Sequence, residues 1–168
     1  MKIGIVYYSR TGNTKHVAKI LEEKFKEKKI EVDLIEIEHL KRPGFFTAGR
    51  SALKQLELPI KNTDFDMKNY DFIIIGSPTW AGYPSPFIKT FMSKAENIKG
   101  KNAAVFGTGI SPINSREKFK EVIENNLKSV GVKTVDNFLA LRMKKGQILD
   151  GEQNIDNFVK TVLKMEMK

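Results

Sequence analysis

The sequence predicts an α/β fold built on a five-stranded parallel sheet with helices on both faces. Three observations carry this prediction. Short apolar runs alternate with amphipathic helical stretches along the whole chain, which is the pattern of parallel sheets joined by right-handed crossovers. The run 71–75, DFIII, is apolar at nearly every position, as expected of a strand buried on both faces. No repeat, low-complexity segment or linker interrupts the 168 residues, so we expect one domain spanning 1–168.

The first three elements follow from local pattern. Residues 2–8, KIGIVYY, are apolar and β-branched and predict a strand. Residues 13–28 predict a helix because Val17, Leu21 and Phe25 fall on one face. Residues 31–37, EVDLIEI, alternate acidic and apolar side chains, which predicts an edge strand with one solvated face.

The connection over residues 41–70 is longer than most loops in compact domains. Within it, Phe46 to Leu56 predicts a helix, and Pro43, Gly44 and Pro59 mark its ends. We expect this segment to cover a site or a neighbouring subunit, which would make a homodimer through residues 41–70.

The second half of the chain continues the alternation. Ser85 and Pro86 open a helix, with Ser at the N-cap and Pro at the first helical position. The remaining predicted elements are a strand over 102–107, a helix over 115–130, a strand within 132–141 and a helix from about Ile155.

Composition and charge limit the function classes. The chain has no cysteine, which excludes disulfides, thiolate catalysis and iron–sulfur ligation by this chain. Lys and Arg exceed Asp and Glu by 29 to 20, a net charge of +9. The lysines alternate with glutamates instead of clustering with aromatics, so we expect no nucleic-acid partner. An acidic protein partner is left open.

Membrane association and secretion are not expected. No apolar run approaches the roughly 18 residues of a membrane span. The start MKIGIVYYSR lacks the pattern of a signal peptide. The cytoplasm is the expected location.

Three segments rich in Gly, Ser, Thr or Pro follow the first, third and fourth predicted strands. They read SRTGNT over 9–14, GSPTWAGYPSP over 76–86 and GTGISPINS over 107–115. The carboxyl ends of parallel strands meet at one edge of the sheet, where ligands bind at the switch point of the strand order. The coincidence of three such segments predicts a binding site there.

The first of these segments suits a terminal phosphate. Ser9, Thr11 and Thr14 supply hydroxyl donors next to a helix N-terminus, and Gly12 lets the backbone curl. Plain N-capping of the helix is the alternative, but it needs only one such side chain. Neither the Walker pattern nor the Gly-x-Gly-x-x-Gly dinucleotide pattern fits this segment.

Trp80 is the only Trp of the chain and lies in the second segment. Either it plugs the core or its indole stacks on a flat ligand ring. Pro78, Pro84 and Pro86 stiffen the segment, and its place at the predicted site favours stacking.

The first two segments together resemble the flavodoxin family and its flavodoxin-like relatives. Ser-x-Thr-Gly-Asn-Thr follows the first strand and Gly-Ser-Pro-Thr-Trp-Ala-Gly the third. The first pattern matches the family's Thr/Ser-x-Thr-Gly-x-Thr phosphate loop, and the alternation of elements matches over about residues 1–165. The resemblance implies a three-layer α/β/α flavodoxin-like sandwich of the short-chain type with strand order 2-1-3-4-5.

The same resemblance implies non-covalently bound FMN. By it, the phosphate contacts are Ser9, Arg10, Thr11, Gly12, Asn13 and Thr14. The residues that flank the isoalloxazine ring are Pro78, Thr79, Trp80, Ala81 and Gly82, while Thr108 and Gly109 approach its pyrimidine side. The Ala81–Gly82 peptide resembles the family's flexible peptide at flavin N5.

Two departures from the family bear on redox properties. Electron-carrier flavodoxins are strongly acidic, whereas this chain has a net charge of +9. Their third loop often holds a Tyr and several acids, and GTGISPINS has neither. A basic surround stabilises an anionic reduced flavin, so we expect a less negative reduction potential than is usual for the family.

The function inferred is that of an FMN-dependent electron carrier between redox proteins, with an acidic partner left open. An NAD(P)H-dependent FMN or quinone reductase is the alternative, and a flavin-free interaction module is the third. No side chain is expected to act as a catalytic acid or base. No metal site is expected, because His16 and His39 lack further ligands at metal spacing.

Overall fold

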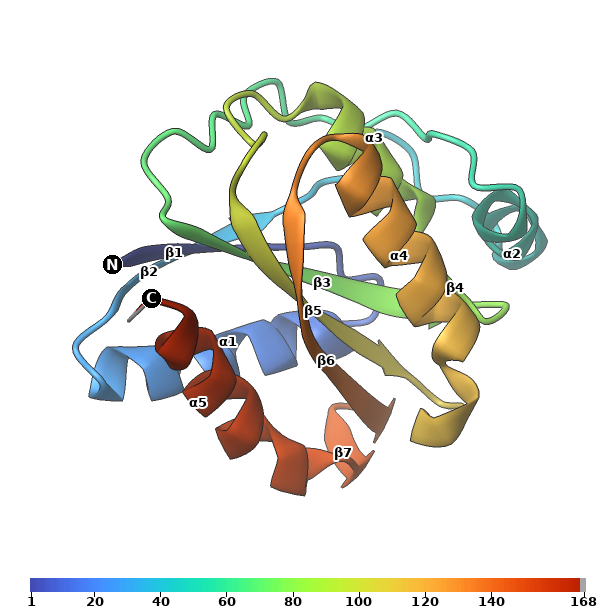
Figure 1. The fold of residues 1–168 in the computed structure, drawn as a ribbon. Helices are drawn as coiled ribbons and strands as arrows, with labels where there is room; N and C mark the ends of the chain where they lie inside the picture. Colours follow the sequence, from blue (N-terminus) through green and yellow to red (C-terminus); the bar gives the residue numbers. More distant parts are fainter. Residues whose placement is uncertain (167–168) are drawn as a thin grey trace.

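The computed structural model describes residues 1–166, and it is built around one twisted parallel sheet (Figure 1). Its parallel strands are β1 (Lys2–Tyr7), β2 (Glu31–Glu36), β3 (Phe72–Trp80), β5 (Asn102–Gly109) and β6 (Lys133–Lys144). They lie in the order β2-β1-β3-β5-β6. This confirms the predicted order 2-1-3-4-5 and places the switch point between β1 and β3.

The sheet also holds two short antiparallel strands, so the predicted count of five was too low. β4 (Tyr83–Pro84) folds back on β3, and β7 (Gln147–Asp150) folds back on β6. The turn before β7 is the two-residue Lys145-Gly146, with φ of 49° and 80°. Positive φ at both positions matches the twist of a hairpin, and it lets β6 run past the predicted end at residue 141.

Five helices complete the fold. They are α1 (Asn13–Glu27), α2 (Phe45–Leu53), α3 (Pro86–Lys94), α4 (Glu117–Ser129) and α5 (Ile155–Glu166). Single 3₁₀ turns precede α4 and α5. Figure 1 shows α1 and α5 on one face of the sheet and α3 and α4 on the other.

Two apolar cores lie on opposite faces of the sheet, because successive strand residues point to opposite sides. On β3, Ile74 packs into the core formed with α1 and α5. Its neighbours Ile73 and Ile75 pack into the core formed with α3 and α4. All three are fully buried, as the sequence predicted for this strand.

The segment between β2 and β3 packs on α3 instead of hanging free. The Thr90 hydroxyl accepts the Leu58 N–H at 2.9 Å and donates to the Leu58 carbonyl at 2.8 Å. The Lys89 ammonium donates to the Gln55 carbonyl at 2.7 Å. The predicted helix is present, although α2 ends at Leu53 and not at Leu56, because Gln55 takes up a left-handed φ of 49°.

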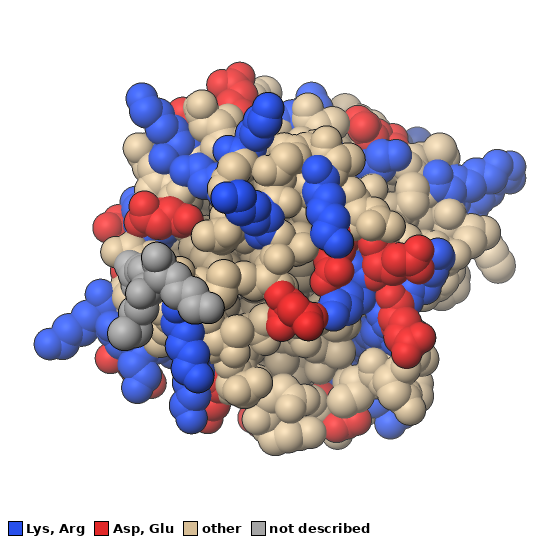
Figure 2. All heavy atoms as spheres, viewed as in Figure 1, with Lys and Arg blue, Asp and Glu red and all other residues tan. Residues whose placement is uncertain are grey.

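The surface charges are mixed on the face shown in Figure 2, where Lys and Arg are interspersed with Asp and Glu. Among the described residues, none of the helices has the length and hydropathy needed to cross a bilayer.

Candidate functional site

The three polar segments meet at the carboxyl edge of the sheet. The hydroxyl oxygens of Thr14 and Thr108 are 2.9 Å apart and join the first segment to the third. Pro78 pairs with Thr108 between β3 and β5, which joins the second segment to the third. The Arg10 guanidinium carbon lies 5.6 Å from the centroid of the Trp80 ring and joins the first to the second. The structure therefore brings together the segments that the sequence assigned to one site.

The first segment forms a nest of free backbone donors at the N-terminus of α1. Gly12 is the N-cap with a left-handed φ of 89°, and no side chain caps the helix there. No acceptor in residues 1–166 takes the backbone N–H groups of Thr11, Gly12, Asn13 and Thr14. Free N–H groups at the positive end of a helix dipole suit an anion, and the exposed Gly12 leaves room for one.

Three side chains of this segment make hydrogen bonds within residues 1–166, and one is free to reach a ligand. The Ser9 hydroxyl accepts the Lys15 N–H at 3.2 Å, which holds the curl of the loop. The Asn13 side-chain oxygen accepts the Gly146 N–H at 2.9 Å, from the turn between β6 and β7. Thr14 is buried against Thr108. Thr11 is exposed and is therefore the side chain best placed to reach a bound anion.

The second segment forms a hairpin, so the third strand runs well past the 71–75 that the sequence indicated. β3 continues through Pro78 and Thr79 to Trp80 before it turns back into β4. Ala81 and Gly82 form the turn, with φ of 50° and 85°. Both angles are those of a type I′ hairpin turn, for which Ala is an unfavourable first residue. The tip of the hairpin therefore holds backbone strain at the site.

Trp80 packs against the core with the edge of its ring but is not fully buried. Its ring makes edge contacts with Tyr8, at a centroid distance of 5.7 Å, and with Phe87 at 6.2 Å. The side chain is nevertheless only partly buried, and the cation of Arg10 lies over the ring. A flat ligand that stacks on that face would have to displace Arg10.

Two arginines make the electrostatic potential around Tyr8 and Trp80 positive. Burial raises the pKa of Tyr8, and the charges of Arg10 and Arg42 partly oppose that rise. Arg42 comes from the segment between β2 and α2, and its guanidinium donates to the Arg10 carbonyl at 3.5 Å. The segment 41–70 thus contacts the first polar segment.

Thr79 offers a hydroxyl with no partner in the described chain. Its oxygen is buried and makes no hydrogen bond. It lies beside Gly109, where an added Cβ would come within 3.3 Å of the same oxygen. A buried hydroxyl left unsatisfied is costly. The Thr79 hydroxyl lies next to Gly109, in the region that the resemblance assigns to the ring.

Arg116 is a buried charged residue beside these segments that the sequence did not point to. It is 2% exposed, and its guanidinium donates to the carbonyls of Gly107, Ser111 and Leu141. Burial lowers its pKa to about 10. In the sequence it stands between Ser115 and Glu117 at the start of a helix, where a charged residue is normally exposed. No local signal shows that it turns inward.

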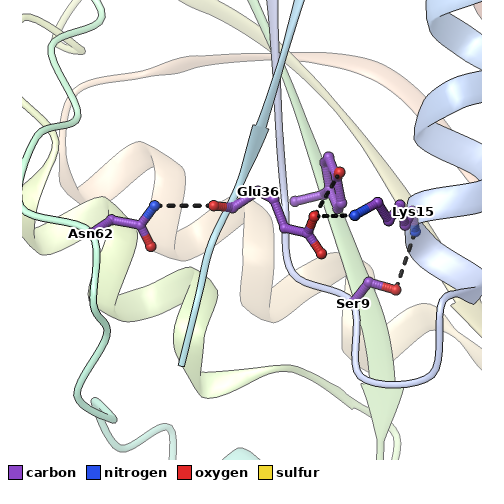
Figure 3. A network of polar contacts seen from close by, with 5 residues as sticks. Ser9, Lys15, Glu36 and Asn62 are labelled. Carbon is purple, nitrogen blue, oxygen red and sulfur yellow. Dashed lines mark hydrogen bonds and ion pairs between the residues drawn. The ribbon is translucent and has the colours of Figure 1, made fainter. Parts of the chain in front are cut away.

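A polar network borders the first segment on its β2 side (Figure 3). The Lys15 ammonium lies 2.6 Å from the Glu36 carboxylate, and the Asn62 amide donates to the Glu36 carbonyl at 3.0 Å. Ser9 and Glu36 also line a small cavity of about 130 Å³. The Lys15 ammonium beside the nest is therefore already paired with a carboxylate.

Comparison with known proteins agrees with this geometry. Over 140 residues the chain is 25% identical to a flavodoxin of Synechocystis, covering 80% of this chain and 68% of that protein. It is 30% identical over 128 residues to an NAD(P)H dehydrogenase (quinone) of Archaeoglobus fulgidus, covering 69% and 65%. The chain thus spans about two thirds of the length of these relatives.

The fold is shared with solved flavoproteins. A Lactobacillus acidophilus flavoprotein, solved in complex with FMN, superposes with a TM-score of 0.67 at 24% identity, covering 94% of this chain and 97% of that one. The family model described as NADPH-dependent FMN reductase matches residues 1–142. With a nest for an anion, a partly open indole and this match over most of its length, the chain belongs to the NADPH-dependent FMN reductase family, on a flavodoxin-like fold.

Proposed function

We propose that this protein is an FMN-dependent redox protein that carries electrons between protein partners. The observation that carries the proposal is the meeting of three polar segments at the switch point of the sheet, through the Thr14–Thr108 and Arg10–Trp80 contacts. The family match and the flavodoxin relatives support FMN as the cofactor. When bound, FMN supplies the capacity to accept and return one or two electrons.

The chain's own residues then bind and orient the cofactor. The free N–H groups of Thr11 to Thr14 receive the phosphate, and the Thr11 hydroxyl adds a donor. The backbone of Arg10 lies beside them. The proposed ring contacts are Pro78, Thr79, Trp80, Ala81, Gly82, Thr108 and Gly109. No side chain needs to act as an acid or base.

The visible spectrum of the purified protein tests this proposal. We expect a yellow protein, or a colourless one that quenches the fluorescence of added FMN at 1:1 stoichiometry. Mass spectrometry of the released cofactor identifies it. Protein that stays colourless after FMN is added would favour the flavin-free interaction module instead.

An NAD(P)H-dependent FMN or quinone reductase is the second candidate. The family description and the Archaeoglobus relative favour it. Mixing the FMN-loaded protein with NADPH under anaerobic conditions separates the two functions. Rapid bleaching of the flavin absorbance, followed by reoxidation with a quinone, favours the enzyme, and an unchanged spectrum favours the carrier.

We further propose that an acidic redox protein docks on the α2 surface, defined here as residues 39–56. This stretch contains Lys41, Arg42, Arg50 and Lys54 and no Asp or Glu. It exposes large apolar side chains that include Phe45 and Phe46, at 82% and 91%. Exposed aromatic side chains within a basic rim match the anatomy of a protein interface for an acidic partner.

The α2 surface lies beside the cofactor site. A Cβ placed on Gly49 of α2 would sit 3.8 Å from the Cβ of Ala81, in the hairpin turn. A partner docked there would bring its redox centre close to the ring. Reduced plant-type [2Fe–2S] ferredoxin, an acidic one-electron donor, is a usable probe, since two such proteins supply the two electrons that fully reduce FMN.

Charge reversal tests the docking surface. We expect the Lys41→Glu/Arg42→Glu variant to slow flavin reduction by the ferredoxin at least tenfold at low ionic strength, where steering is strongest. Lys128→Glu/Lys133→Glu makes the same charge change at exposed positions on α4 and β6 and serves as the control. Equal slowing by both variants would contradict docking at the α2 surface.

A homodimer through residues 41–70 is the other occupant that the sequence suggested for this surface. Analytical ultracentrifugation of the wild type and of Phe45→Ser/Phe46→Ser decides between them. A dimer that the variant disrupts would assign the surface to a second copy. The cytoplasm stays the proposed compartment, and cell fractionation checks it.

A further inference from the structure

Arg116 is among the largest buried side chains of the protein. It stands at the N-cap of α4, where its carbonyl accepts the Lys120 N–H at 3.0 Å. Its side chain turns away from solvent, under the segment that follows β5. Arg116 is not among the residues proposed to contact FMN, so those contacts give no reason for a charged side chain in this position.

The guanidinium is held only by backbone carbonyls. One terminal nitrogen donates to Gly107 at 2.9 Å, and the other donates to Ser111 at 3.1 Å and to Leu141 at 3.0 Å. These carbonyls belong to β5, to the segment after it and to β6. The fork of Arg116 therefore ties the segment 107–111 to the sheet.

The positive charge of Arg116 is not neutralised by a carboxylate. Within residues 1–166, no ion pair joins it to an acidic residue, and its Nε is buried without a partner. Burial alone lowers its pKa, to about 10, so the group keeps its proton at neutral pH. An uncompensated buried charge is expensive, whereas a Met of similar length would fill the same space without that cost.

The charge lies directly behind the proposed ring site. A Cβ on Gly109 would sit 3.2 Å from a terminal nitrogen of Arg116 and 3.1 Å from the Cβ of Thr79. Gly109 and Thr108 are the residues proposed for the pyrimidine side of the ring. Little water separates the guanidinium from that backbone, so its field is only weakly screened.

We propose that Arg116 is a positioning residue that holds the segment 107–111 and places a fixed positive charge behind the pyrimidine side of FMN, and that this charge strengthens the binding of reduced FMN more than that of oxidised FMN. This rests on the proposed function. Two electrons from the redox partner and one proton at N5 leave reduced FMN with a negative charge on its pyrimidine ring. A nearby cation lowers the free energy of that form and not of the neutral oxidised ring.

The test compares the affinities of oxidised and reduced FMN in neutral and charged variants. We expect Arg116→Gln and Arg116→Met to lower the affinity for reduced FMN at least tenfold more than the affinity for oxidised FMN. For a two-electron couple this lowers the midpoint potential of the bound flavin by about 30 mV. Arg116→Lys loses the three guanidinium hydrogen bonds but keeps a positive charge. It should therefore lower the affinity for both forms of FMN and shift the midpoint potential less. The melting temperature of each apoprotein is measured first.

Two matched controls separate charge from shape. Arg142 also donates to the same segment, to the Ile110 carbonyl at 3.0 Å, but its side chain is exposed. Arg142→Gln should leave the potential unchanged because solvent screens that charge. Gly109→Ala disturbs the segment 107–111 and keeps the charges of Arg116 and Arg142. It should therefore lower the affinities for oxidised and reduced FMN equally.

Equal weakening of the two forms by the neutral Arg116 variants would overturn the proposal, as would an equal shift of potential from Arg142→Gln. Failure of the proposed function looks different, because the wild type would then bind neither form of FMN. Met keeps the volume of the buried site, so a folded neutral variant is available if Gln is not tolerated.

Discussion

The two edges of the sheet are built in opposite ways. At the amino edge, the Lys2 ammonium lies 2.7 Å from Glu31 and 2.9 Å from Asp33. The Tyr70 hydroxyl donates to Asp33 at 3.0 Å, and the Lys101 ammonium donates to the Tyr70 carbonyl at 2.6 Å. The polar groups of this edge satisfy one another.

At the carboxyl edge, polar groups are left over. The described chain has three buried side-chain atoms without a hydrogen-bond partner, in Thr79, Ser85 and Arg116, and all three belong to segments at this edge. The free N–H groups at the start of α1 lie here too. The amino edge therefore pairs its own polar groups, whereas the carboxyl edge leaves several of them unpaired within residues 1–166.

The largest expected effect is the loss of FMN binding on removal of the hydroxyls of the nest. Thr11→Val removes a donor at the phosphate site, worth about 1.5–3 kcal/mol if bonded to a charged group. Thr14→Val in the same variant breaks the buried Thr14–Thr108 hydrogen bond that joins the first segment to the third. We expect the FMN dissociation constant, measured by fluorescence quenching, to rise roughly 100-fold or more.

The control for this variant is Thr63→Val, at an exposed position outside the site. Its affinity for FMN should equal that of the wild type. An unchanged affinity in the double variant, with the apoprotein still folded, would show that the nest does not hold the phosphate.

Thr79→Val should separate stability from binding. The hydroxyl is buried and unpaired in the described chain, so its replacement by a methyl group of similar shape should leave the apoprotein as stable, or more stable by up to about 1 kcal/mol. FMN affinity should fall about tenfold if the ring satisfies this hydroxyl. Urea unfolding of the apoprotein and FMN titration measure the two effects. A less stable apoprotein would mean that the hydroxyl has a partner in solution.

The sequence predicted the parts of the site that follow from topology. Parallel strands end at one edge, so the meeting of Thr11, Trp80 and Thr108 at that edge could be expected once the strands were recognised. The apolar run around Ile74 was long enough to identify the central strand. The order of the strands came from the resemblance and not from the pattern alone.

What the sequence did not predict depends on contacts between distant residues. Thr14 meets Thr108 across 94 positions, and Arg116 turns inward to carbonyls that only the folded sheet provides. The hairpins were missed because Ala81-Gly82 and Lys145-Gly146 lack the Asn or Asp that usually marks a type I′ turn.

A smaller effect is expected at the tip of the hairpin. Ala81 holds a φ of 50°, a region that costs a non-glycine residue about 1–2 kcal/mol. Ala81→Gly removes this strain but adds unfolded-state entropy of about 0.5–1 kcal/mol. We expect a net gain in the free energy of unfolding below about 1 kcal/mol, measured by urea titration. Gly44→Ala, at a position with φ of −60°, is the control. A loss of stability in Ala81→Gly would show that the turn is not strained.

The smallest effect is expected at the amino edge. Asp33→Asn removes the pairing with Lys2 and Tyr70, and solvent screening limits the loss of stability to below about 1 kcal/mol. Hydrogen bonds from Lys2 and Tyr70 lower the pKa of Asp33 from its ordinary 3.8. A carboxyl group with a lowered pKa stabilises the folded protein at any pH above its ordinary pKa. This stabilisation is lost as the pH falls through the folded-state pKa.

Urea unfolding of the wild type and of Asp33→Asn should therefore differ at pH 7 and converge as the pH falls through the folded-state pKa of Asp33. FMN affinity at pH 7 should be the same in both, because Asp33 lies at the edge opposite the site. A fall in FMN affinity that matches that of Thr79→Val would break the division between the two edges, since an amino-edge carboxylate would then be acting on the ligand site.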